Sequence, residues 1–100
     1  MTNYSVGASY ERRFINELLK SGKAIRGARF YHSEGPTDVW WVDGEGKHME
    51  AQLKFSKNKP YITPDELENL HKFAKLVAPM INVYLIKKQF RKEQVGELIT

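Results

Sequence analysis

The stretch that decides the fold is residues 38–55, which read DVWWVDGEGKHMEAQLKF. It begins with a short run of β-branched and aromatic residues, which is typical of a strand. Asp43 and Gly44 follow and favour a tight turn. From 47 to 55 apolar residues then alternate with polar ones, and this period of two predicts a second strand with one apolar and one polar face. The stretch is therefore expected to form a β-hairpin.

The register of this hairpin brings polar side chains together. If the strands pair through a turn at 43–46, positions that sum to about 90 lie opposite one another, so Asp38 comes level with Gln52. Glu50 and Lys54 flank Gln52 on the same face. Because carboxylate and amide oxygens suit a hard divalent cation, Asp38, Glu50 and Gln52 are candidate ligands for Mg²⁺ or Mn²⁺. Lys54 would orient an attacking water or stabilise developing negative charge.

A second interpretation of the same face stays open. An alternating Glu, Gln and Lys pattern is also typical of the solvent side of an amphipathic strand. A sheet flanked by helices leaves its inner strands little solvent face, which favours the site. The spacing alone does not separate the two interpretations.

The residues before the hairpin predict a helix and a strand. Between 4 and 20, apolar residues recur every three to four positions, as in an amphipathic helix, and Gly22 stands where a C-capping glycine is favoured. Residues 23–31 carry aromatic and β-branched side chains and predict a strand. Gly27 interrupts that strand and predicts a bulge or bend.

The residues after the hairpin predict a second helix and a further strand. Thr63, Pro64 and Glu66 have the pattern of an N-cap, a first-turn proline and a capping-box partner. The nearly continuous apolar run at 81–88 predicts a buried strand. The tail, 89–100, is expected to be a short helix or partly ordered. The chain thus predicts an α/β fold, a small central mixed sheet flanked by helices in the order αβββαβ, as a single domain over 1–100.

Composition narrows the function without deciding it. The 16 basic and 12 acidic side chains give a net charge of +4, which suits a polyanionic partner but does not require one. The absence of cysteine excludes disulfides, thiolate zinc sites and a cysteine nucleophile. No apolar run approaches the roughly 18 residues of a membrane span, and residues 1–13 lack a signal-peptide pattern. We therefore expect no membrane partner and a cytoplasmic location.

Three segments together resemble the archaeal Holliday-junction resolvases (Hjc) and the wider PD-(D/E)xK nuclease superfamily. Residues 7–29, GASYERRFINELLKSGKAIRGAR, are similar to the family's opening, in which Gly-x-x-x-Glu-Arg begins a helix. Residues 35–54, GPTDVWWVDGEGKHMEAQLK, are similar to its Pro-Asp, hairpin, (Asp/Glu)-x-Lys core. Residues 60–88, PYITPDELENLHKFAKLVAPMINVYLIKK, resemble the helix and strand that follow. The resemblance implies a restriction-endonuclease-like fold.

The resemblance also implies roles for individual residues. Asp38 would bind a metal ion, Mg²⁺ or Mn²⁺, and Glu11 would complete the metal shell or position its water. Lys54 would assist the attack on phosphorus. A serine in the loop before the motif aspartate aids catalysis in the family, and Ser33 is the candidate here.

Two positions depart from the family pattern. The residue two before Lys54 is Gln52 where the family usually has a carboxylate, and Thr37 separates Pro36 from Asp38. A neutral amide oxygen is a poorer ligand for a hard cation, so Gln52 should weaken metal binding. Glu50 lies on the same strand face about 7 Å away, and we expect it to supply the missing carboxylate.

The implied activity is that of a Mg²⁺-dependent endodeoxyribonuclease with a part in DNA recombination or repair, in an archaeal or virus-infected host cell. Its partner would be branched or junction DNA, and because a four-way junction has two strands to cut, a homodimer is expected. The predicted phosphate contacts are Arg12, Arg29, Lys57 and Lys59. Two alternatives remain: a nuclease for single-stranded or linear DNA, and a non-catalytic DNA-binding module on the same fold.

Overall fold

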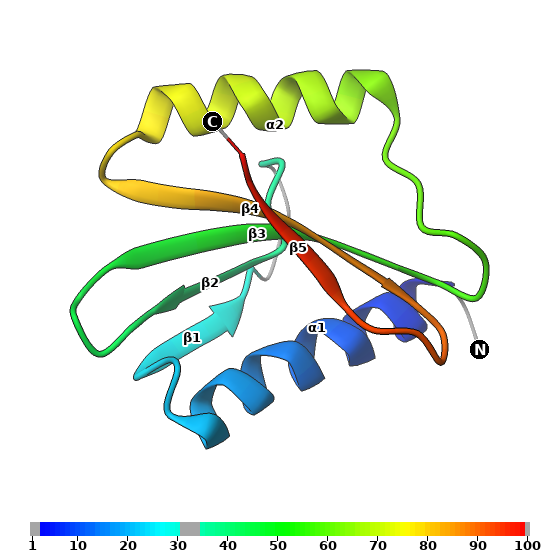
Figure 1. Ribbon diagram of the computed structural model, residues 1–100, viewed down its shortest axis with the longest axis horizontal. Helices are drawn as coiled ribbons and strands as arrows, with labels where there is room; N and C mark the ends of the chain where they lie inside the picture. The colour runs from blue at the N-terminus through cyan, green and yellow to red at the C-terminus, as the bar shows by residue number, and fades with distance from the viewer. Residues whose placement is uncertain (1–2, 31–34, 100) are drawn as a thin grey trace.

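Two helices lie on opposite faces of one five-stranded sheet in the computed structural model (Figure 1). The structure describes residues 3–30 and 35–99, and only the backbone of residues 3–7. Along the sheet the strands are β1 (Arg26–Arg29), β2 (Val39–Val42), β3 (His48–Ser56), β4 (Ile81–Gln89) and β5 (Val95–Ile99). β3 and β4 are parallel, whereas every other neighbouring pair is antiparallel. The predicted mixed sheet flanked by helices is confirmed.

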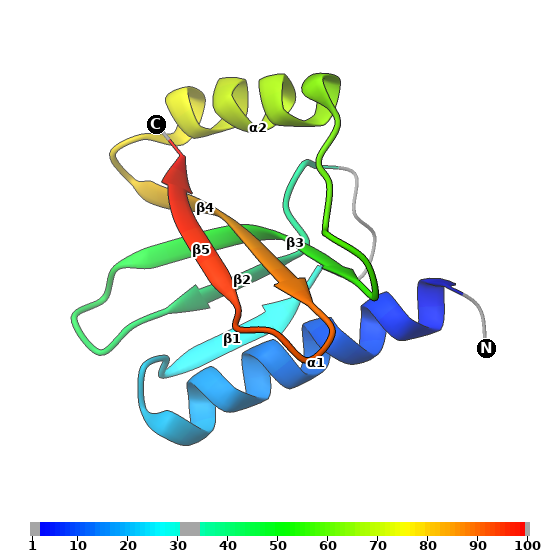
Figure 2. The same cartoon turned by 45° about the vertical axis from the view of Figure 1, so that its right-hand side comes forward.

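Helix α1 (Asn3–Ser21) covers the β1, β2 and β3 side of the sheet (Figures 1 and 2). Its buried stripe includes Tyr10 and Phe14, and the Phe14 ring meets Trp41 of β2 edge-on, with ring centroids 5.5 Å apart. Each large apolar side chain removed from water in this way stabilises the fold by roughly 1.5–3 kcal/mol. The helix ends at Gly22, whose φ of 81° is the left-handed conformation that glycine adopts at little cost.

Helix α2 (Pro64–Val77) covers the opposite face of the sheet, over β4 and β5. Its predicted capping box is present: the Thr63 hydroxyl accepts a hydrogen bond from the Glu66 backbone N–H, and the Glu66 carboxylate accepts one from the Thr63 backbone N–H. Leu70 and Ala74 are buried against β4. No helix in the described part of the chain combines the length and the apolar character that crossing a membrane requires.

The hairpin has the predicted register. Val39 pairs with Ala51 and Trp40 with Glu50, so positions that sum to 90 lie opposite one another. The Asp43 carboxylate accepts hydrogen bonds from the backbone N–H groups of Glu45 and Lys47, which closes the turn. The turn chemistry therefore sets which polar side chains of β3 lie beside the start of β2.

Gly27 does not form the expected bulge. It pairs regularly with Trp41 across β1 and β2. A Cβ at this position would lie 2.9 Å from the Trp40 carbonyl oxygen and 2.9 Å from the Trp41 Cβ. The glycine is there because the two strands approach each other too closely for a side chain.

The tail forms a fifth strand, so the expectation of a short helix or partly ordered segment is wrong. β5 pairs antiparallel with β4, after a turn in which the Lys92 N–H bonds to the Gln89 carbonyl. Ile99 is buried in the cluster beneath α2, and its burial supplies the reason for strand pairing at the end of the chain.

Candidate active site between the hairpin and helix α2

A polar cavity of about 350 Å³ opens between the start of β2, the middle of β3 and the first turns of α2. Asp38, Gln52 and Lys54 line it, as the sequence predicts for three residues of one site. Glu66 and Asn69 line it from α2. The hairpin register and the crossover from β3 to α2 together bring these five side chains to one place.

Asp38 is fixed in place by β3. Its backbone N–H donates to the Ala51 carbonyl at 2.8 Å, and its carboxylate Oδ2 accepts the Leu53 backbone N–H at 2.8 Å. Burial raises the pKa of Asp38 from 3.8 to about 6, against the opposing effect of the Leu53 hydrogen bond. The carboxylate is thus held rigidly in a setting that a cation would stabilise.

Gln52 is almost fully buried, with 9% of its surface exposed. Its amide Nε2 donates to Glu66 Oε2 at 3.3 Å. Its amide oxygen is buried and meets no hydrogen-bond donor among residues 3–30 and 35–99. A buried oxygen without a donor costs free energy unless a ligand satisfies it.

Lys54 and Glu66 form the shortest ion pair of the site, with 2.6 Å between Lys54 Nζ and Glu66 Oε2. The hydrogen bond from Lys54, followed by that from the Thr63 backbone, lowers the pKa of Glu66 to about 2. The capping pattern locates Glu66 in the first turn of α2, but sequence reasoning did not place it in the site. The available signal was the short connection from β3 to α2, which returns the start of the helix toward that strand.

Glu11, on α1, does not line this cavity. Its Oε1 lies 2.9 Å from Arg29 Nε, an ion pair that ties the helix to β1. Its charge also acts on Asp38, where it adds to the rise in pKa that burial causes. Glu11 therefore contributes negative potential at Asp38 while its own charge is balanced by Arg29.

Glu50, which the sequence offers as the compensating carboxylate, does not line the cavity. Glu50 is buried, and its Oε1 accepts a hydrogen bond of 2.7 Å from the Thr37 hydroxyl. Its Oε2 lies 3.9 Å from His48 Nε2. The Thr37 hydroxyl thus holds the Glu50 carboxylate outside the cavity lining.

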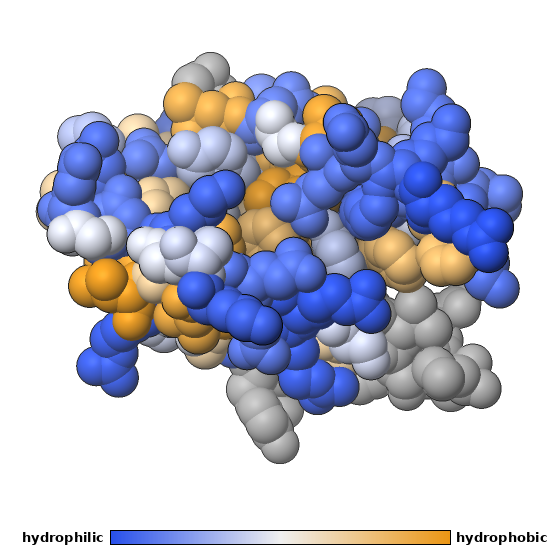
Figure 3. Space-filling model, turned by 60° about the horizontal axis from the view of Figure 1, so that its bottom comes forward, coloured by the Kyte–Doolittle hydropathy of each residue, from blue (hydrophilic) through white to orange (hydrophobic). Residues whose placement is uncertain are grey.

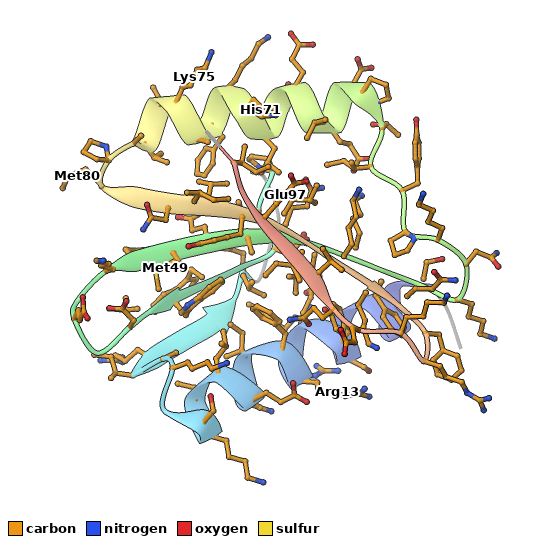
Figure 4. All side chains as sticks on the ribbon, in the orientation of Figure 1. Arg13, Met49, His71, Lys75, Met80 and Glu97 are labelled. Carbon is orange, nitrogen blue, oxygen red and sulfur yellow. The ribbon has the colours of Figure 1, made fainter. Side chains whose placement is uncertain are left out.

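The remaining predicted site residues do not line the cavity in the described part of the chain. Ser33 falls outside the described residues. Lys57 and Lys59 are exposed in the segment between β3 and α2, and Arg12 is exposed on α1. Arg29 is a half-buried partner of Glu11. The side of the molecule that carries α1 is mostly hydrophilic (Figure 3), and Arg13 there points away from the sheet (Figure 4).

The donor set of the cavity supplies part of the coordination shell of a hard cation. In the described ranges, no three His, Cys, Asp or Glu side chains stand close enough to hold a metal ion by themselves. Asp38 and Glu66 offer two carboxylates, and Gln52 offers an unpaired amide oxygen. Mg²⁺ usually takes one or two carboxylates together with water and substrate phosphate oxygens, so this set suits it.

The fold and the site place the chain in a structural class. A small mixed sheet between two helices, with an acid and a lysine on adjoining strands of a hairpin, is the restriction-endonuclease-like arrangement. Among solved structures, the chain is similar to Hjc, a Holliday junction resolvase from the archaeal hyperthermophile Archaeoglobus fulgidus. The TM-score is 0.69 at 25% sequence identity, over 91% of this chain and 74% of that chain. Neither a scan of protein-family models nor a search of curated proteins returns a match.

Proposed function

We propose that this protein is a metal-dependent DNA endonuclease that hydrolyses phosphodiester bonds in branched DNA such as a Holliday junction. The observation that carries the proposal is the convergence of Asp38, Gln52 and Lys54 on one cavity, in a fold similar to that of a junction resolvase. The same three positions stand where the sequence resemblance puts metal ligands and the motif lysine.

Asp38 and Gln52 are the residues that would hold Mg²⁺ or Mn²⁺. Asp38 presents a carboxylate that is ionised above about pH 6, and Gln52 presents a buried oxygen without a donor. When bound, the metal lowers the pKa of a coordinated water and neutralises charge on the scissile phosphate. Glu11 adds negative potential at Asp38, which favours the binding of a cation there.

Lys54 is placed to act on the reacting phosphate. Its side chain lines the cavity and is 25% exposed, and its ammonium group contacts the Glu66 carboxylate. From this position it orients the attacking water and stabilises the negative charge that develops on the phosphate oxygens. Attack by water oxygen on phosphorus and departure of the 3′ oxygen would leave a 5′-phosphate and a 3′-hydroxyl.

Exposed basic residues outside the cavity supply the contacts to the DNA backbone. Lys57 and Lys59 follow the β3 strand that carries Lys54, and Arg12 lies on the exposed side of α1. Neutralising phosphates with such side chains supplies affinity without sequence preference. This suits recognition of a DNA shape rather than of a base sequence.

A homodimer is part of the proposal, because two strands of a junction need two sites related by a twofold axis. Large apolar side chains are exposed at Leu76 of α2 and at Met80 after it. Two more are exposed at Phe90, after β4, and at Leu98 of β5. Sedimentation velocity at several concentrations, with and without a four-way junction, measures whether two copies assemble.

The experiment that tests the activity offers four-way junction, single-stranded and linear duplex DNA to the protein with Mn²⁺. Wild type is compared with Asp38→Ala and Lys54→Ala, and with Lys47→Ala as a control on the exposed hairpin turn. We expect Mn²⁺-dependent cutting of the junction that either site variant abolishes and the control retains. Cutting that survives Asp38→Ala would contradict the proposal.

One observation favours a second candidate, a DNA-binding module without catalysis. Position 52 carries an amide, and the nearest acid on the same strand face, Glu50, is held by Thr37. Tight junction binding without cutting by the wild type, in Mg²⁺ and in Mn²⁺, would establish this alternative.

A further inference from the structure

Position 52 of β3 carries a neutral glutamine where a carboxylate would add negative charge to the site. Residues 52 and 54 lie on the same face of β3, so a carboxylate at 52 would lie beside the lysine and face Asp38 across the hairpin. Gln52 cannot supply that charge. Asp38 alone would leave a divalent cation with a single carboxylate from the hairpin.

The Glu66 carboxylate lies beside Gln52 and Lys54, where a carboxylate at position 52 would place its negative charge. Its Oε2 is 2.6 Å from Lys54 Nζ and 3.3 Å from Gln52 Nε2, so one carboxylate oxygen contacts both residues of the strand pair. It lines the same cavity as Asp38, and its charge is close enough to raise the pKa of Asp38 further. No other acidic side chain of the described chain lines that cavity together with Asp38.

Helix α2 keeps this carboxylate in position. The other oxygen of Glu66, Oε1, accepts the Thr63 backbone N–H as part of the capping box. One oxygen thus anchors the side chain to its own helix while the other faces the strand. The Lys54 contact keeps Glu66 ionised through the neutral range, because it holds the pKa near 2.

A second observation points to a ligand at this place. The amide oxygen of Gln52 is buried without a donor among the residues that the structure describes, and Gln52 is 9% exposed. Its amide nitrogen is used by Glu66, so the oxygen is the free end of a side chain that lines the cavity. A cation between Asp38 and Glu66 would satisfy it.

We infer that Glu66, from the first turn of helix α2, supplies the metal-binding carboxylate that position 52 lacks, so that Asp38, Gln52 and Glu66 together bind one Mg²⁺ or Mn²⁺. The inference rests on the proposed metal-dependent function. It differs from the sequence expectation, because the compensating acid comes from a different element and not from Glu50.

The test measures Mn²⁺ binding without DNA, by titration calorimetry and by the electron paramagnetic resonance signal of free Mn²⁺. Glu66→Gln removes the charge but keeps a side chain that serves in a capping box. We expect it to weaken Mn²⁺ binding by about tenfold or more. Adding Gln52→Glu to Glu66→Gln returns a carboxylate to the same place and should restore affinity.

Two variants control for helix stability and for net charge. Thr63→Ala removes the cap hydroxyl and should lower the melting temperature with little change in Mn²⁺ affinity. Glu68→Gln removes an exposed acid two residues further along α2 and should bind Mn²⁺ as the wild type does.

The outcomes separate this inference from the proposed function. Unchanged Mn²⁺ binding by Glu66→Gln overturns the inference. The proposed function still holds in that case if the wild type binds Mn²⁺ and cuts DNA. Loss of binding that Gln52→Glu does not restore also overturns it, because Glu66 would then not be filling the place of residue 52. A wild type that binds no Mn²⁺ overturns both.

Discussion

Lys54 Nζ lies 2.6 Å from Glu66 Oε2, and this contact joins the middle of the sheet to the first turn of α2. Both side chains are partly exposed, at 25% and 37%, and such pairs contribute about 0–1 kcal/mol to stability. The contact therefore adds little to the fold. Its importance lies in the site, where it places a cationic and an anionic side chain together in the lining of one cavity.

The pKa of Asp38 predicts how the stability of the metal-free protein depends on pH. Its folded value of about 6 lies above the ordinary 3.8, so between these values the folded state keeps a proton that the unfolded state has lost. Stability from this group is full below about pH 4 and falls as the pH rises toward 7, by on the order of 1–3 kcal/mol. Urea unfolding of wild type and Asp38→Asn in EDTA measures it. The variant should match wild type below about pH 4 and become the more stable of the two as the pH rises toward 7.

The stability contributed by Glu66 should depend on pH in the opposite direction to that of Asp38, which makes Glu66 a control. Its pKa is lowered from 4.5 to about 2, so its contribution is present above about pH 4.5 and is lost as the pH falls toward 2. Glu66→Gln should lose stability relative to wild type at neutral pH and match it in acid. An Asp38→Asn variant that is destabilised at pH 7 would contradict the assigned burial of this carboxylate.

Gly27→Ala should destabilise the sheet. The new Cβ would lie 2.9 Å from a backbone oxygen of Trp40 and 2.9 Å from the Trp41 Cβ, so β1 has to move away from β2. Overpacking of this kind costs about 1–3 kcal/mol. Gly44→Ala is the matched control, because nothing lies within 4 Å of a Cβ there. Equal midpoints of chemical unfolding for the two variants would show that the strands are not so closely placed.

Glu50→Gln should leave Mn²⁺ binding unchanged. Its carboxylate belongs to the hydrogen bond with Thr37 and not to the cavity, and a glutamine oxygen still accepts that bond. Glu50→Ala instead leaves the buried Thr37 hydroxyl without its partner and should cost about 1–3 kcal/mol of stability. Loss of Mn²⁺ affinity in Glu50→Gln would contradict this prediction and indicate that Glu50 takes part in metal binding.

Lys57→Gln with Lys59→Gln should weaken junction binding and flatten its salt dependence. Each phosphate contact that is lost lowers the slope of log affinity against log salt by about 1, so the pair should lower it by about 2. Lys75→Gln, on the outer side of α2 in Figure 4, is the control for net charge. Fluorescence anisotropy with labelled junction DNA at several salt concentrations measures the slopes, and equal slopes would exclude the two lysines from the contact surface.

The parts of the fold that local chemistry determines could be predicted from the sequence. The Asp43 turn sets the hairpin register, so Asp38 and Gln52 were expected at the same level. The capping box of Thr63 and Glu66 fixes the start of α2 in the same local way. Such features depend on residues within a few positions of one another.

The parts that depend on tertiary contacts could not be predicted. Val95–Ile99 forms a strand because it pairs with the edge of β4 and because Ile99 is buried in the core. The sequence of the tail alone indicates neither contact. Thr37 holds Glu50 outside the cavity lining through a hydrogen bond between residues 13 positions apart in the chain. Glu66 lies in the site through its contact with Lys54, which is 12 residues earlier in the chain, before the connection from β3 to α2.

The most direct test of the central claim is a crystal soaked in Mn²⁺ and measured for the anomalous signal of the metal. The account predicts one anomalous peak in the cavity, at bonding distance from an Asp38 carboxylate oxygen and from the Gln52 amide oxygen, and its disappearance in Asp38→Asn. A peak only at other acidic side chains, or a cavity without Mn²⁺ at a concentration that supports cleavage, would contradict the account.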